Sequence, residues 1–379
     1  MNVSPTSSSS GNRTLGSAKA AKQDEFYTQL NDINNELKHY KAHLRGKVVL
    51  CNCDDPFESN FFKYFALNFY ALGIQKLLAT SYHHSPIVGG QLPLIEIEGL
   101  KPESKEPYAV EINEVPDVNK DGAIDMLDIE HLLRRDANTA RPLKGDEKYG
   151  GGDFRSRECV DILNEADIVV TNPPFSLFRE YVAQLVEHGK QFLIIGSKNA
   201  ITYKEFFKLI SENKVWIGVT PMGVDLLFDV PDAVAKAMID SGKEGSNYKL
   251  VNGKVKGRST SAWFTNLDNP KRHEQILLYK KYSPAEYPTY ANFDGIEVSR
   301  VVDIPVDYDG AMGVPITFLD KYNPDQFDIL GSSMTLGLPM SEVAPKGTYL
   351  QGGPRFYLEN GNGTYRRQYD RIVIKRRRQ

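Results

Sequence analysis

The residues Asn172-Pro173-Pro174-Phe175 combine an amide, two rigid rings and an aromatic face. They follow an apolar, β-branched run at 168–170, which is typical of a strand buried on both faces of a parallel sheet. Because proline has no N–H and fixes φ, the Asn172 side chain and the nearby carbonyls are available as hydrogen-bond acceptors at the strand's tip. The pattern predicts a site that accepts an amino group.

Length and composition bound the chemistry. The chain has 379 residues, 41% of them hydrophobic, and this length predicts two domains. Residues 1–22 are rich in Ser, Gly and Asn and are expected to form a disordered tail rather than a signal peptide. The cysteines Cys51, Cys53 and Cys159 fit neither a disulfide framework nor a zinc pattern, which indicates buried thiols in a cytoplasmic protein.

The elements that must position Asn172 are strands alternating with helices. Residues 47–53 and 76–82 are predicted strands on either side of a helix, and such a βαβ unit indicates an α/β protein with an open parallel sheet. Ligands bind at the carboxyl edge of such a sheet, where Asp54 and Asp55 follow the first strand. Capping of the next helix is the alternative role for these two carboxylates.

Residues 85–150 are predicted to form an insertion that contains an EF-hand-like loop. Oxygen-bearing side chains occupy positions 1, 3, 5, 9 and 12 of a twelve-residue segment, with glycine at position 6. The candidate calcium ligands are Asp117, Asn119, Asp121, Asp125 and Asp128. The alternative is a solvated acidic turn that leads into a helix.

The C-terminal part differs in composition and charge. From residue 271 onward helical periodicity disappears, and a mostly β or irregular domain at 271–379 is predicted. Although the net charge of the chain is −3, its end is basic and rich in tyrosine, which suits contact with phosphates and bases. The candidate DNA-binding residues are Lys254, Lys256 and Arg258 in a hairpin, and Arg366, Arg367, Arg371, Lys375 and Arg376 near the C-terminus. For the hairpin, a solvated strand face is the alternative.

Several short motifs resemble the EcoRI-type family of adenine-specific DNA methyltransferases, and the resemblance runs from residue 23 to the C-terminus. The motifs are Asp24-Glu25-Phe26-Tyr27-Thr28, Cys51-Asn52-Cys53-Asp54-Asp55-Pro56, Ser59-Asn60-Phe61-Phe62-Lys63, Gly152-Asp153-Phe154-Arg155-Ser156, Asn172-Pro173-Pro174-Phe175 and Asn323-Pro324-Asp325-Gln326-Phe327. The resemblance implies a Rossmann-like, S-adenosylmethionine-dependent catalytic domain at 23–270 and a DNA target-recognition region at 271–379. It also implies transfer of a methyl group to the N6 amine of a flipped-out adenine in double-stranded DNA.

The family resemblance further assigns residues to the cofactor. The implied S-adenosylmethionine contacts are Phe26, Tyr27, Thr28, Asn52, Asp54, Asp55, Asp153 and Phe154. Phe26 and Tyr27 would lie near the cationic sulfonium, Asp153 would accept a hydrogen bond from the cofactor's adenine amine, and Phe154 would pack on its ring. Simple packing or turn formation is the alternative for these residues. The chain departs from related methyltransferases in lacking a glycine-rich loop after the first strand.

The implied chemistry fits the residues at 172–175. The lone pair of an adenine amine is delocalised into the ring, so acceptors on its hydrogens return electron density to nitrogen. The Asn172 oxygen and the Pro173 carbonyl would be these acceptors, and Phe175 would stack on the extruded base. Direct attack on the sulfonium methyl needs no catalytic cysteine.

Two other functions share this pattern of residues. Protein glutamine methyltransferases also use an Asn-Pro-Pro-aromatic tip, since a side-chain amide is likewise a planar, weakly nucleophilic amine. A catalytically silent nucleic-acid-binding module is the second alternative. For an adenine methyltransferase we expect a role in restriction-modification or DNA protection, a monomer, and a cognate restriction endonuclease acting on the same site.

Overall fold

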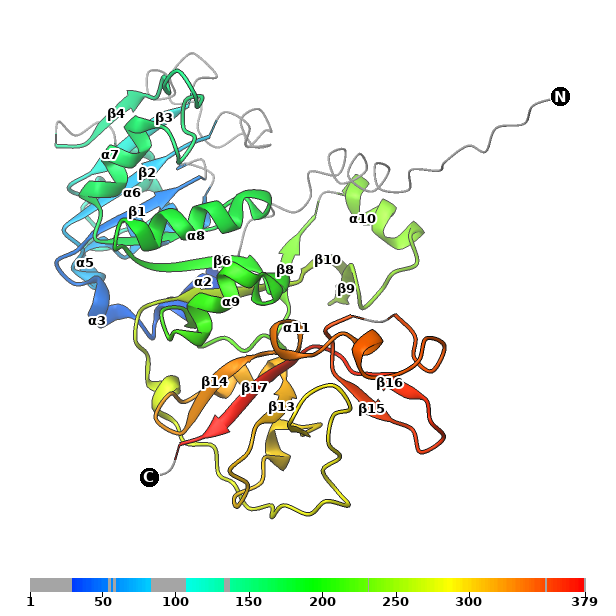
Figure 1. Ribbon diagram of the computed structural model, residues 1–379. Coiled ribbons are helices and arrows are strands. Elements are labelled where there is room, and N and C mark those ends of the chain that lie inside the picture. Colours follow the sequence, from blue (N-terminus) through cyan, green and yellow to red (C-terminus); the bar gives the residue numbers. More distant parts are fainter. Residues whose placement is uncertain are drawn as a thin grey trace. The chain divides into compact units, whose positions relative to one another are not determined.

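The computed structural model describes residues 29–53, 56, 59–82, 107–132, 137–230, 232–351 and 353–377 (Figure 1). The described residues divide by their contacts into two units. The first unit falls within residues 1–34, 44–177 and 225–260, and the second within residues 35–43, 178–224 and 261–379. This division does not follow the boundary at residue 270 that the sequence suggests for target recognition. Among the described residues, no helix is long and apolar enough to cross a membrane.

The large mixed sheet of the first unit has three parallel strands in its interior. They are β1 (Val48–Asn52), β2 (Lys76–Thr80) and β5 (Ile168–Thr171), and β1 pairs with both of the others. Within this unit the strand order is β4-β3-β2-β1-β5. The chain therefore goes from β1 to a neighbour on one side and later to a neighbour on the other, which makes the carboxyl end of β1 a topological switch point.

The region predicted as an insertion extends this sheet. It contributes β3 (Tyr108–Ile112), α6 (Met126–Glu130) and β4 (Thr139–Pro142). Strand β3 pairs antiparallel with β2, and β4 pairs antiparallel with β3. These short strands carry little periodicity of their own, so the sequence did not reveal that they complete the sheet.

Two helices of the first unit begin with serine caps. Helix α4 (Asn60–Leu67) is capped by Ser59, whose hydroxyl accepts hydrogen bonds from the Phe61 and Phe62 backbone N–H groups. Capping of this helix, the alternative role for Asp54 and Asp55, is thus provided by Ser59. Helix α5 (Phe69–Leu72) follows, and α7 (Arg157–Glu165) is capped by Ser156. The aromatic side chains of Phe61, Phe65 and Phe69 recur every four residues and are buried.

A second, smaller sheet of the first unit has the strand order β8-β10-β9. Its strands are β8 (Leu226–Asp229), β9 (Tyr248–Val251) and β10 (Lys254–Ser259), and α10 (Asp232–Asp240) precedes β9. Asn252 and Gly253 join β9 to β10 with φ values of 51° and 75°. These left-handed conformations suit a tight hairpin turn, as the Asn-Gly pair predicts.

The second unit opens with α8 and a group of antiparallel strands. Helix α8 (Phe178–Glu187) precedes β6 (Gln191–Ser197), and α9 (Lys204–Ser211) precedes β7 (Trp216–Ile217). Strand β11 (Ser261–Thr265) pairs antiparallel with both β6 and β7. At Gly196 a Cβ would collide with the Phe178 ring, so glycine lets α8 pack closely on β6. Two helices lie near the start of the described chain, α2 (Leu30–Leu37) and α3 (Lys41–Leu44).

Small sheets form the C-terminal part of the second unit. One has the order β12-β13-β17-β14, with β12 (Ile296–Glu297), β13 (Met312–Pro315), β14 (Phe327–Ser332) and β17 (Arg371–Arg376). The other pairs β15 (Tyr357–Glu359) with β16 (Tyr365–Arg367) across the Asn-Gly-Asn-Gly turn. Residues 371–376 form β17, which lies between β13 and β14.

The remaining elements are short. Helix α11 (Ser333–Leu336) follows β14 directly. The 3-10 helices are η2 (Phe175–Leu177), η3 (Lys198–Thr202), η4 (Pro270–His273), η5 (Val301–Asp303), η6 (Ile316–Lys321) and η7 (Met340–Glu342). The chain is therefore a mixed α/β protein with a large mixed sheet and smaller C-terminal sheets.

Candidate active site

The carboxyl ends of β1, β2 and β5 lie side by side and carry polar residues. Asn52, the last residue of β1, is opposite Thr80 of β2. The Thr171 hydroxyl at the end of β5 donates a hydrogen bond to the Asn52 carbonyl oxygen. This contact joins the ends of two parallel strands at the switch point, where open α/β sheets bind their ligands.

Asn172 follows β5 with an unsatisfied acceptor. Its Oδ1 atom is buried, and it accepts no hydrogen bond from the residues that the structure describes. The Thr80 hydroxyl oxygen at the end of β2 is also buried and has no hydrogen-bond partner among the described residues. A buried polar atom without a partner costs about 1–3 kcal/mol, which a ligand that supplies a donor would recover. Pro173 is buried, whereas Pro174 and Phe175 are half-buried.

The turn after β1 has a glycine-like backbone although it contains no glycine. Cys53 has a φ of 72°, in the left-handed region that non-glycine residues rarely adopt. The chain thus keeps the conformation of a tight turn at the place where related methyltransferases often have glycines. Such strained positions cluster at ligand sites. Asp54, Asp55 and the predicted cofactor residues 26–28 lie outside the described residues.

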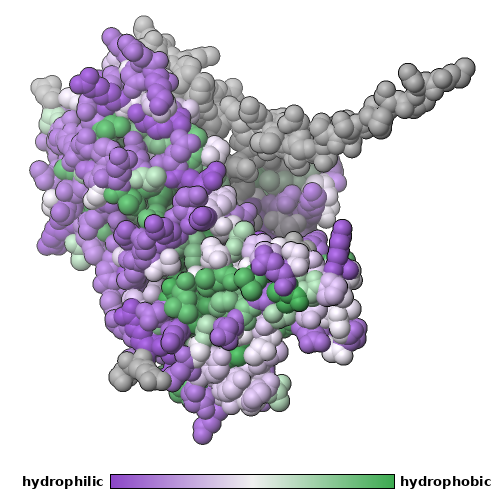
Figure 2. All heavy atoms as spheres, viewed as in Figure 1, coloured by the Kyte–Doolittle hydropathy of each residue, from purple (hydrophilic) through white to green (hydrophobic). Residues whose placement is uncertain are grey.

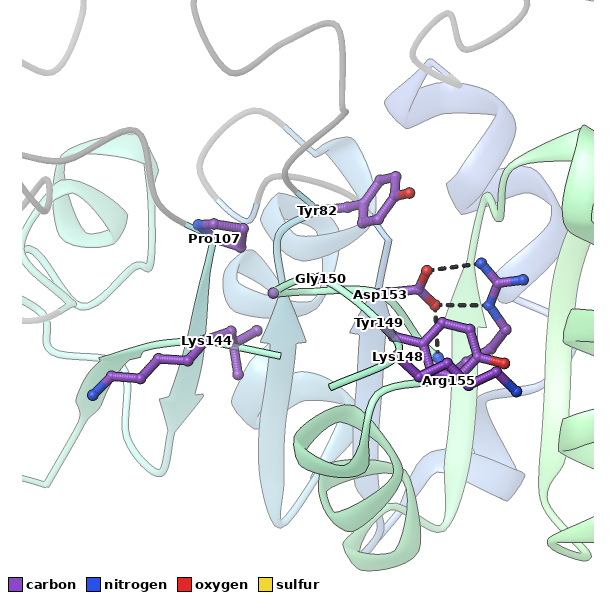
Figure 3. A pocket seen from close by; sticks show the side chains of 10 residues that line it. Tyr82, Pro107, Lys144, Lys148, Tyr149, Gly150, Asp153 and Arg155 are labelled. Atoms are coloured by element: carbon purple, nitrogen blue, oxygen red, sulfur yellow. Dashed lines mark hydrogen bonds and ion pairs between the residues drawn. The ribbon is translucent and has the colours of Figure 1, made fainter. Parts of the chain in front are cut away.

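A pocket of about 690 Å³ lies beside the end of β2 (Figure 3). Its lining combines two tyrosines, basic side chains and one carboxylate, from Tyr82, Pro107, Leu143, Lys144, Lys148, Tyr149, Gly150, Gly151, Asp153 and Arg155. This volume lies in the usual range for sites of small molecules and cofactors. An aromatic and polar lining of this kind fits the nucleoside part of S-adenosylmethionine.

Asp153 is held firmly at the wall of this pocket. Its carboxylate accepts hydrogen bonds from the Arg155 backbone N–H at 2.9 Å and from the Arg155 guanidinium at 3.0 and 2.8 Å. Next to it, Gly152 has a φ of 74°, and a Cβ there would collide with the Ser81 carbonyl oxygen. Glycine at 152 therefore lets the loop with Asp153 approach the end of β2.

Two aromatic residues that the sequence did not single out line the pocket. They are Tyr82 and Tyr149, and the Arg155 guanidinium lies 4.6 Å from the Tyr149 ring centre. Phe154, the predicted partner of the cofactor's adenine, is buried, and its ring centre lies 5.3 Å from the Arg155 guanidinium. Neither tyrosine belongs to a recognisable motif, so only the fold could reveal them.

The loop that carries Tyr149 is fixed by the Asp146 carboxylate. Asp146 accepts hydrogen bonds from the backbone N–H groups of Lys148, Tyr149 and Arg157. These backbone contacts hold the pocket wall whatever side chain stands at position 149.

Comparison with known proteins shows which family the chain belongs to. The family described as "Adenine-specific methyltransferase EcoRI" matches residues 14–377. The chain belongs to this family. The type II methyltransferase M.EcoRI of Escherichia coli is 42% identical over 322 residues, which cover 84% of this chain and 89% of that enzyme. No solved structure matches the chain significantly.

Two mycoplasma relatives match nearly the whole chain. The type II methyltransferase M.MpnI of Mycoplasma pneumoniae is 34% identical over 371 residues, covering 95% of this chain and 97% of that enzyme. M.MgeORF184P of Mycoplasma genitalium is 31% identical, with the same coverages. The chain is thus an adenine-specific DNA methyltransferase of the EcoRI family, of the type II restriction-modification kind. The family implies a Rossmann-like fold, S-adenosylmethionine and a DNA substrate.

The cysteines lie in the core. Cys51, Cys53 and Cys159 are buried and form no disulfide with one another. Burial raises the pKa of the Cys159 thiol to about 11, so the thiolate that a nucleophile needs is scarce at neutral pH.

Arg371 does not fit the DNA contact that the sequence predicted for it. It is 8% exposed, and its guanidinium binds the buried Glu297 carboxylate with an N–O distance of 2.6 Å. The Tyr290 hydroxyl donates to the same carboxylate at 2.5 Å. The assignment of Arg371 to DNA is therefore corrected, because its charge is neutralised in the core.

The other predicted basic residues near the C-terminus lie at the surface. Arg366 and Lys375 are exposed. Arg367 is exposed and its guanidinium contacts the Gln351 side chain. Arg376 is half-buried and donates to the Val306 carbonyl. A phosphate can reach Arg366, Lys375 and Arg367 without unfolding of the sheet.

In the hairpin of the first unit, only part of the predicted basic row is exposed. Lys254 is exposed and Lys256 is half-buried. Arg258 forms an ion pair with Asp225 at 2.6 Å, and Lys249 pairs with the same carboxylate at 2.5 Å. Arg258 thus has an internal carboxylate partner, which the sequence spacing did not indicate.

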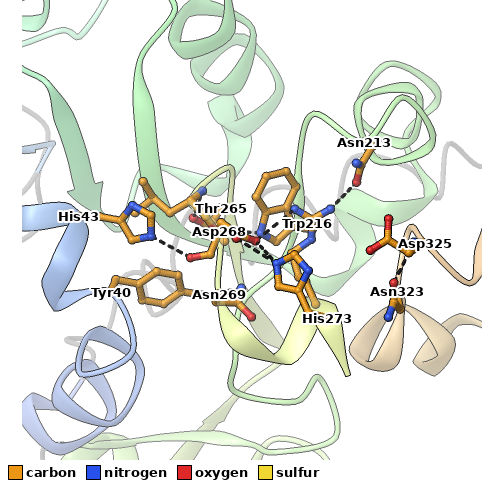
Figure 4. Close-up of polar contacts among 12 residues, drawn as sticks. Tyr40, His43, Asn213, Trp216, Thr265, Asp268, Asn269, His273, Asn323 and Asp325 are labelled. Atoms are coloured by element: carbon orange, nitrogen blue, oxygen red, sulfur yellow. Dashed lines mark hydrogen bonds and ion pairs between the residues drawn. The ribbon is translucent and has the colours of Figure 1, made fainter. Parts of the chain in front are cut away.

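The family motif at 323–327 has a structural role. Asn323 is buried, and its side-chain oxygen accepts a hydrogen bond from the Asp325 backbone N–H at 2.8 Å (Figure 4). The Gln326 side chain binds both the N–H and the carbonyl of Ile276. In the same view, Asn213 accepts a hydrogen bond from the guanidinium of Arg272, which lies 3.4 Å from the Trp216 ring centre. The contacts of Gln326 hold the chain around Ile276 in place, near the start of the C-terminal part of the second unit.

The acidic loop at 117–128 binds mainly its own backbone. Both carboxylate oxygens of Asp128 accept backbone N–H groups, from Val118 at 2.7 Å and from Asp125 at 2.9 Å. The Asp125 carboxylate caps α6. Within the described ranges, no group of three or more histidine, cysteine or acidic side chains is arranged to hold a metal ion. The geometry favours the acidic turn over the calcium site, and calcium binding stays an untested prediction.

Proposed function

We propose that this methyltransferase transfers a methyl group from S-adenosylmethionine to the N6 amine of an adenine swung out of double-stranded DNA. The observation that carries this proposal is the buried, unpartnered Asn172 Oδ1 at the switch point of the sheet. An acceptor in this state needs a donor, and an exocyclic amine is one.

Asn172 and Pro173 act on the amine. The Asn172 Oδ1 and the Pro173 carbonyl oxygen each accept one of its hydrogens, and electron density then returns to the nitrogen lone pair as the new bond forms. Pro174 fixes the turn so that both acceptors point the same way. S-adenosylmethionine, when bound, would supply an electrophilic methyl group to the nitrogen that these acceptors hold, without a covalent enzyme intermediate, and S-adenosylhomocysteine and one amine proton would be released.

Phe175 stacks on the extruded adenine. Its half-buried ring stands at the start of η2, directly after the two prolines. A target amine cannot reach the cofactor inside a base-paired stack, so the base must leave the helix. The energy of stacking on an aromatic ring offsets part of that cost.

The ends of β1 and β2 would hold the cofactor. Asp153 would accept a hydrogen bond from its adenine amine, and Tyr82 and Tyr149, which line the pocket, would provide aromatic walls. Asn52 at the end of β1 would contact it as well. Residues Phe26, Tyr27, Thr28, Asp54, Asp55 and Phe154 would complete the site as the family resemblance implies.

DNA contact involves basic side chains of both units. Lys254, Arg366, Arg367 and Lys375 are exposed, and Lys256 and Arg376 are half-buried. Lysine and arginine at such positions neutralise phosphates and position the duplex, while base readout comes from other contacts.

The biological setting follows from the type II relatives. We propose that the enzyme acts as a monomer in the cytoplasm and protects the cell's DNA from a cognate restriction endonuclease that cuts the same site. A single active site can methylate an asymmetric DNA sequence, or a palindrome one strand at a time.

Sequencing of methylated adenines tests the proposal. DNA from cells that express the wild-type chain should carry N6-methyladenine at one recurring sequence motif, and cells that express Asn172→Ala should lack it at the same protein level. Methylation of cytosine, or methylated adenine without any shared motif, would contradict the proposed target.

A further inference from the structure

An exposed apolar surface lies on the C-terminal part of the second unit. Leu330, Met334 and Leu338 are 47%, 39% and 53% exposed. Figure 2 shows hydrophobic residues gathered over β14 and α11 on the face that it presents. We call Leu330, Met334 and Leu338 the α11 apolar surface. Exposed apolar residues that cluster in this way mark a contact surface more often than single ones do.

The fold directs Leu330 outward with a β-bulge. Strand β14 pairs with β17, but the register shifts between Ile329 and Gly331, so Leu330 is the extra residue. Bulges at sheet edges redirect a side chain, and β14 is an edge strand of its sheet. The bulge thus turns one large apolar side chain away from the core.

Helix α11 is held rigidly beside this bulge. Ser332 and Thr335 form a capping box at its start. Leu336 packs inward on the cluster of Tyr290, Phe356, Leu358 and Val373, which leaves Met334 on the other side. Figure 1 shows α11 directly after β14. A rigid support of this kind reduces the entropy lost when a partner binds.

Asn292 fixes the end of the surface. It is buried, and its side-chain amide donates to the Leu338 carbonyl at 2.7 Å and to the Arg355 carbonyl at 2.6 Å. Its oxygen accepts the Tyr357 backbone N–H at 3.0 Å. One side chain therefore ties the apolar surface to the strand that leads into the basic β15–β16 hairpin.

The β15–β16 hairpin, which Asn292 connects to the end of the surface, carries exposed positive charge. In that hairpin, Arg366 and Arg367 are exposed, and the Arg367 guanidinium contacts Gln351. Leu350, next to Gln351 in the sequence, is 83% exposed. Exposed apolar side chains and exposed guanidinium groups in one part of the fold suit DNA, which offers phosphates next to base surfaces.

We propose that the α11 apolar surface contacts the bases of the target DNA, packing on thymine methyl groups. This rests on the proposed function, because it assumes that duplex DNA is the substrate. Leucine and methionine are the side chains that proteins insert at distorted base steps, and apolar groups read thymine methyls. A second copy of the chain fits less well, since a stable dimer would bring like charges of the two hairpins together.

The contact has a signature that separates it from phosphate binding. Apolar packing releases no counterions, so its loss weakens binding without changing the slope of log affinity against log salt. Loss of a phosphate contact changes both.

The test uses the double variant Met334→Gln/Leu338→Gln in the full chain. Glutamine nearly keeps the length of each side chain, and both positions are exposed, so the fold should be kept. The control is Leu277→Gln, at a leucine that is 84% exposed outside the surface. The DNA is a duplex with the methylated motif found by sequencing. We expect about 10- to 50-fold weaker binding by the double variant, from the loss of two apolar contacts.

Several outcomes decide the matter. The salt slope and S-adenosylmethionine affinity should stay unchanged, Met334→Leu should bind like the wild type, and Leu277→Gln should too. Wild-type affinity of the double variant would overturn the inference. A wild-type dimer in sedimentation that the double variant loses would overturn it as well and assign the surface to a second copy. If the wild-type chain itself neither binds nor methylates DNA, the proposed function fails instead.

Discussion

Asn172 and Arg371 both carry buried polar atoms that the sequence pointed to as functional, but their hydrogen bonding is opposite. The Asn172 Oδ1 atom accepts nothing from the described residues, at an edge where ligands bind. The Arg371 guanidinium has its partner in Glu297, 74 residues away in the sequence. The comparison separates a buried acceptor that a ligand could still engage from a buried cation whose partner lies inside the fold.

The first test of this comparison concerns Arg371. Arg371→Met should lower the free energy of unfolding by about 3–5 kcal/mol, because it leaves the Glu297 carboxylate buried without a counter-charge. Chemical denaturation of both forms measures this loss. Adding Glu297→Gln should restore part of it.

Lys375→Met is the matched control, since Lys375 is an exposed cation on the same strand. It should leave the unfolding free energy nearly unchanged. If Arg371→Met unfolds like the wild type but loses DNA binding, the role in the fold would be wrong and the sequence prediction right.

Asn172→Ala should lower activity rather than stability, which is the reverse of the effect expected for Arg371→Met. Removal of one acceptor of the reacting amine should lower kcat about 10²- to 10³-fold, while the unfolding free energy stays the same or rises slightly. Single-turnover methylation and denaturation measure the two quantities. Asn164→Ala, at an exposed position in α7, is the control and should retain activity.

Replacement of exposed cations at the C-terminus should change neither kcat nor the free energy of unfolding, but it should change DNA affinity. For Arg366→Ala/Lys375→Ala, we expect the salt slope of DNA binding to fall by about 1.8, which is roughly 0.9 for each lost phosphate contact. Binding measured from low to moderate salt gives this slope. An unchanged slope would remove both residues from the interface.

The smallest effect concerns the acidic loop. Asp128→Ala should cost about 1–3 kcal/mol of stability, because two backbone N–H groups lose their acceptor. Calcium should leave the Tm of the wild-type chain unchanged relative to chelator. A Tm that rises with calcium and stays constant in Asp117→Ala/Asp121→Ala would reinstate the metal site.

The sequence predicted the elements that local patterns define. Residues 168–171 form the expected strand, and the Asn252-Gly253 turn forms the expected hairpin, because β-branched runs and Asn-Gly pairs carry their conformations locally. The family resemblance led to the same reaction as the comparisons did. Motifs of a few residues suffice where the chemistry depends on neighbours in the chain.

The partners of charged side chains could not be predicted in this way. Arg258 pairs with Asp225, and Arg371 pairs with Glu297, through contacts that exist only after folding. Likewise, Tyr149 reaches the pocket because the loop at 144–158 folds back on its own carboxylates. Tertiary contacts, rather than residue type, decided which basic and aromatic residues remain available to a ligand.

Identification of the methylated nucleoside tests the central claim most directly. Wild-type and Asn172→Ala proteins are incubated with S-adenosylmethionine labelled in its methyl group and with genomic DNA, which is then digested to nucleosides. We predict that the wild type places all label in N6-methyl-2′-deoxyadenosine, and that Asn172→Ala still binds S-adenosylmethionine but transfers almost none. Label in a cytosine product, or undiminished transfer by Asn172→Ala, would contradict the role of the strand tip at Asn172.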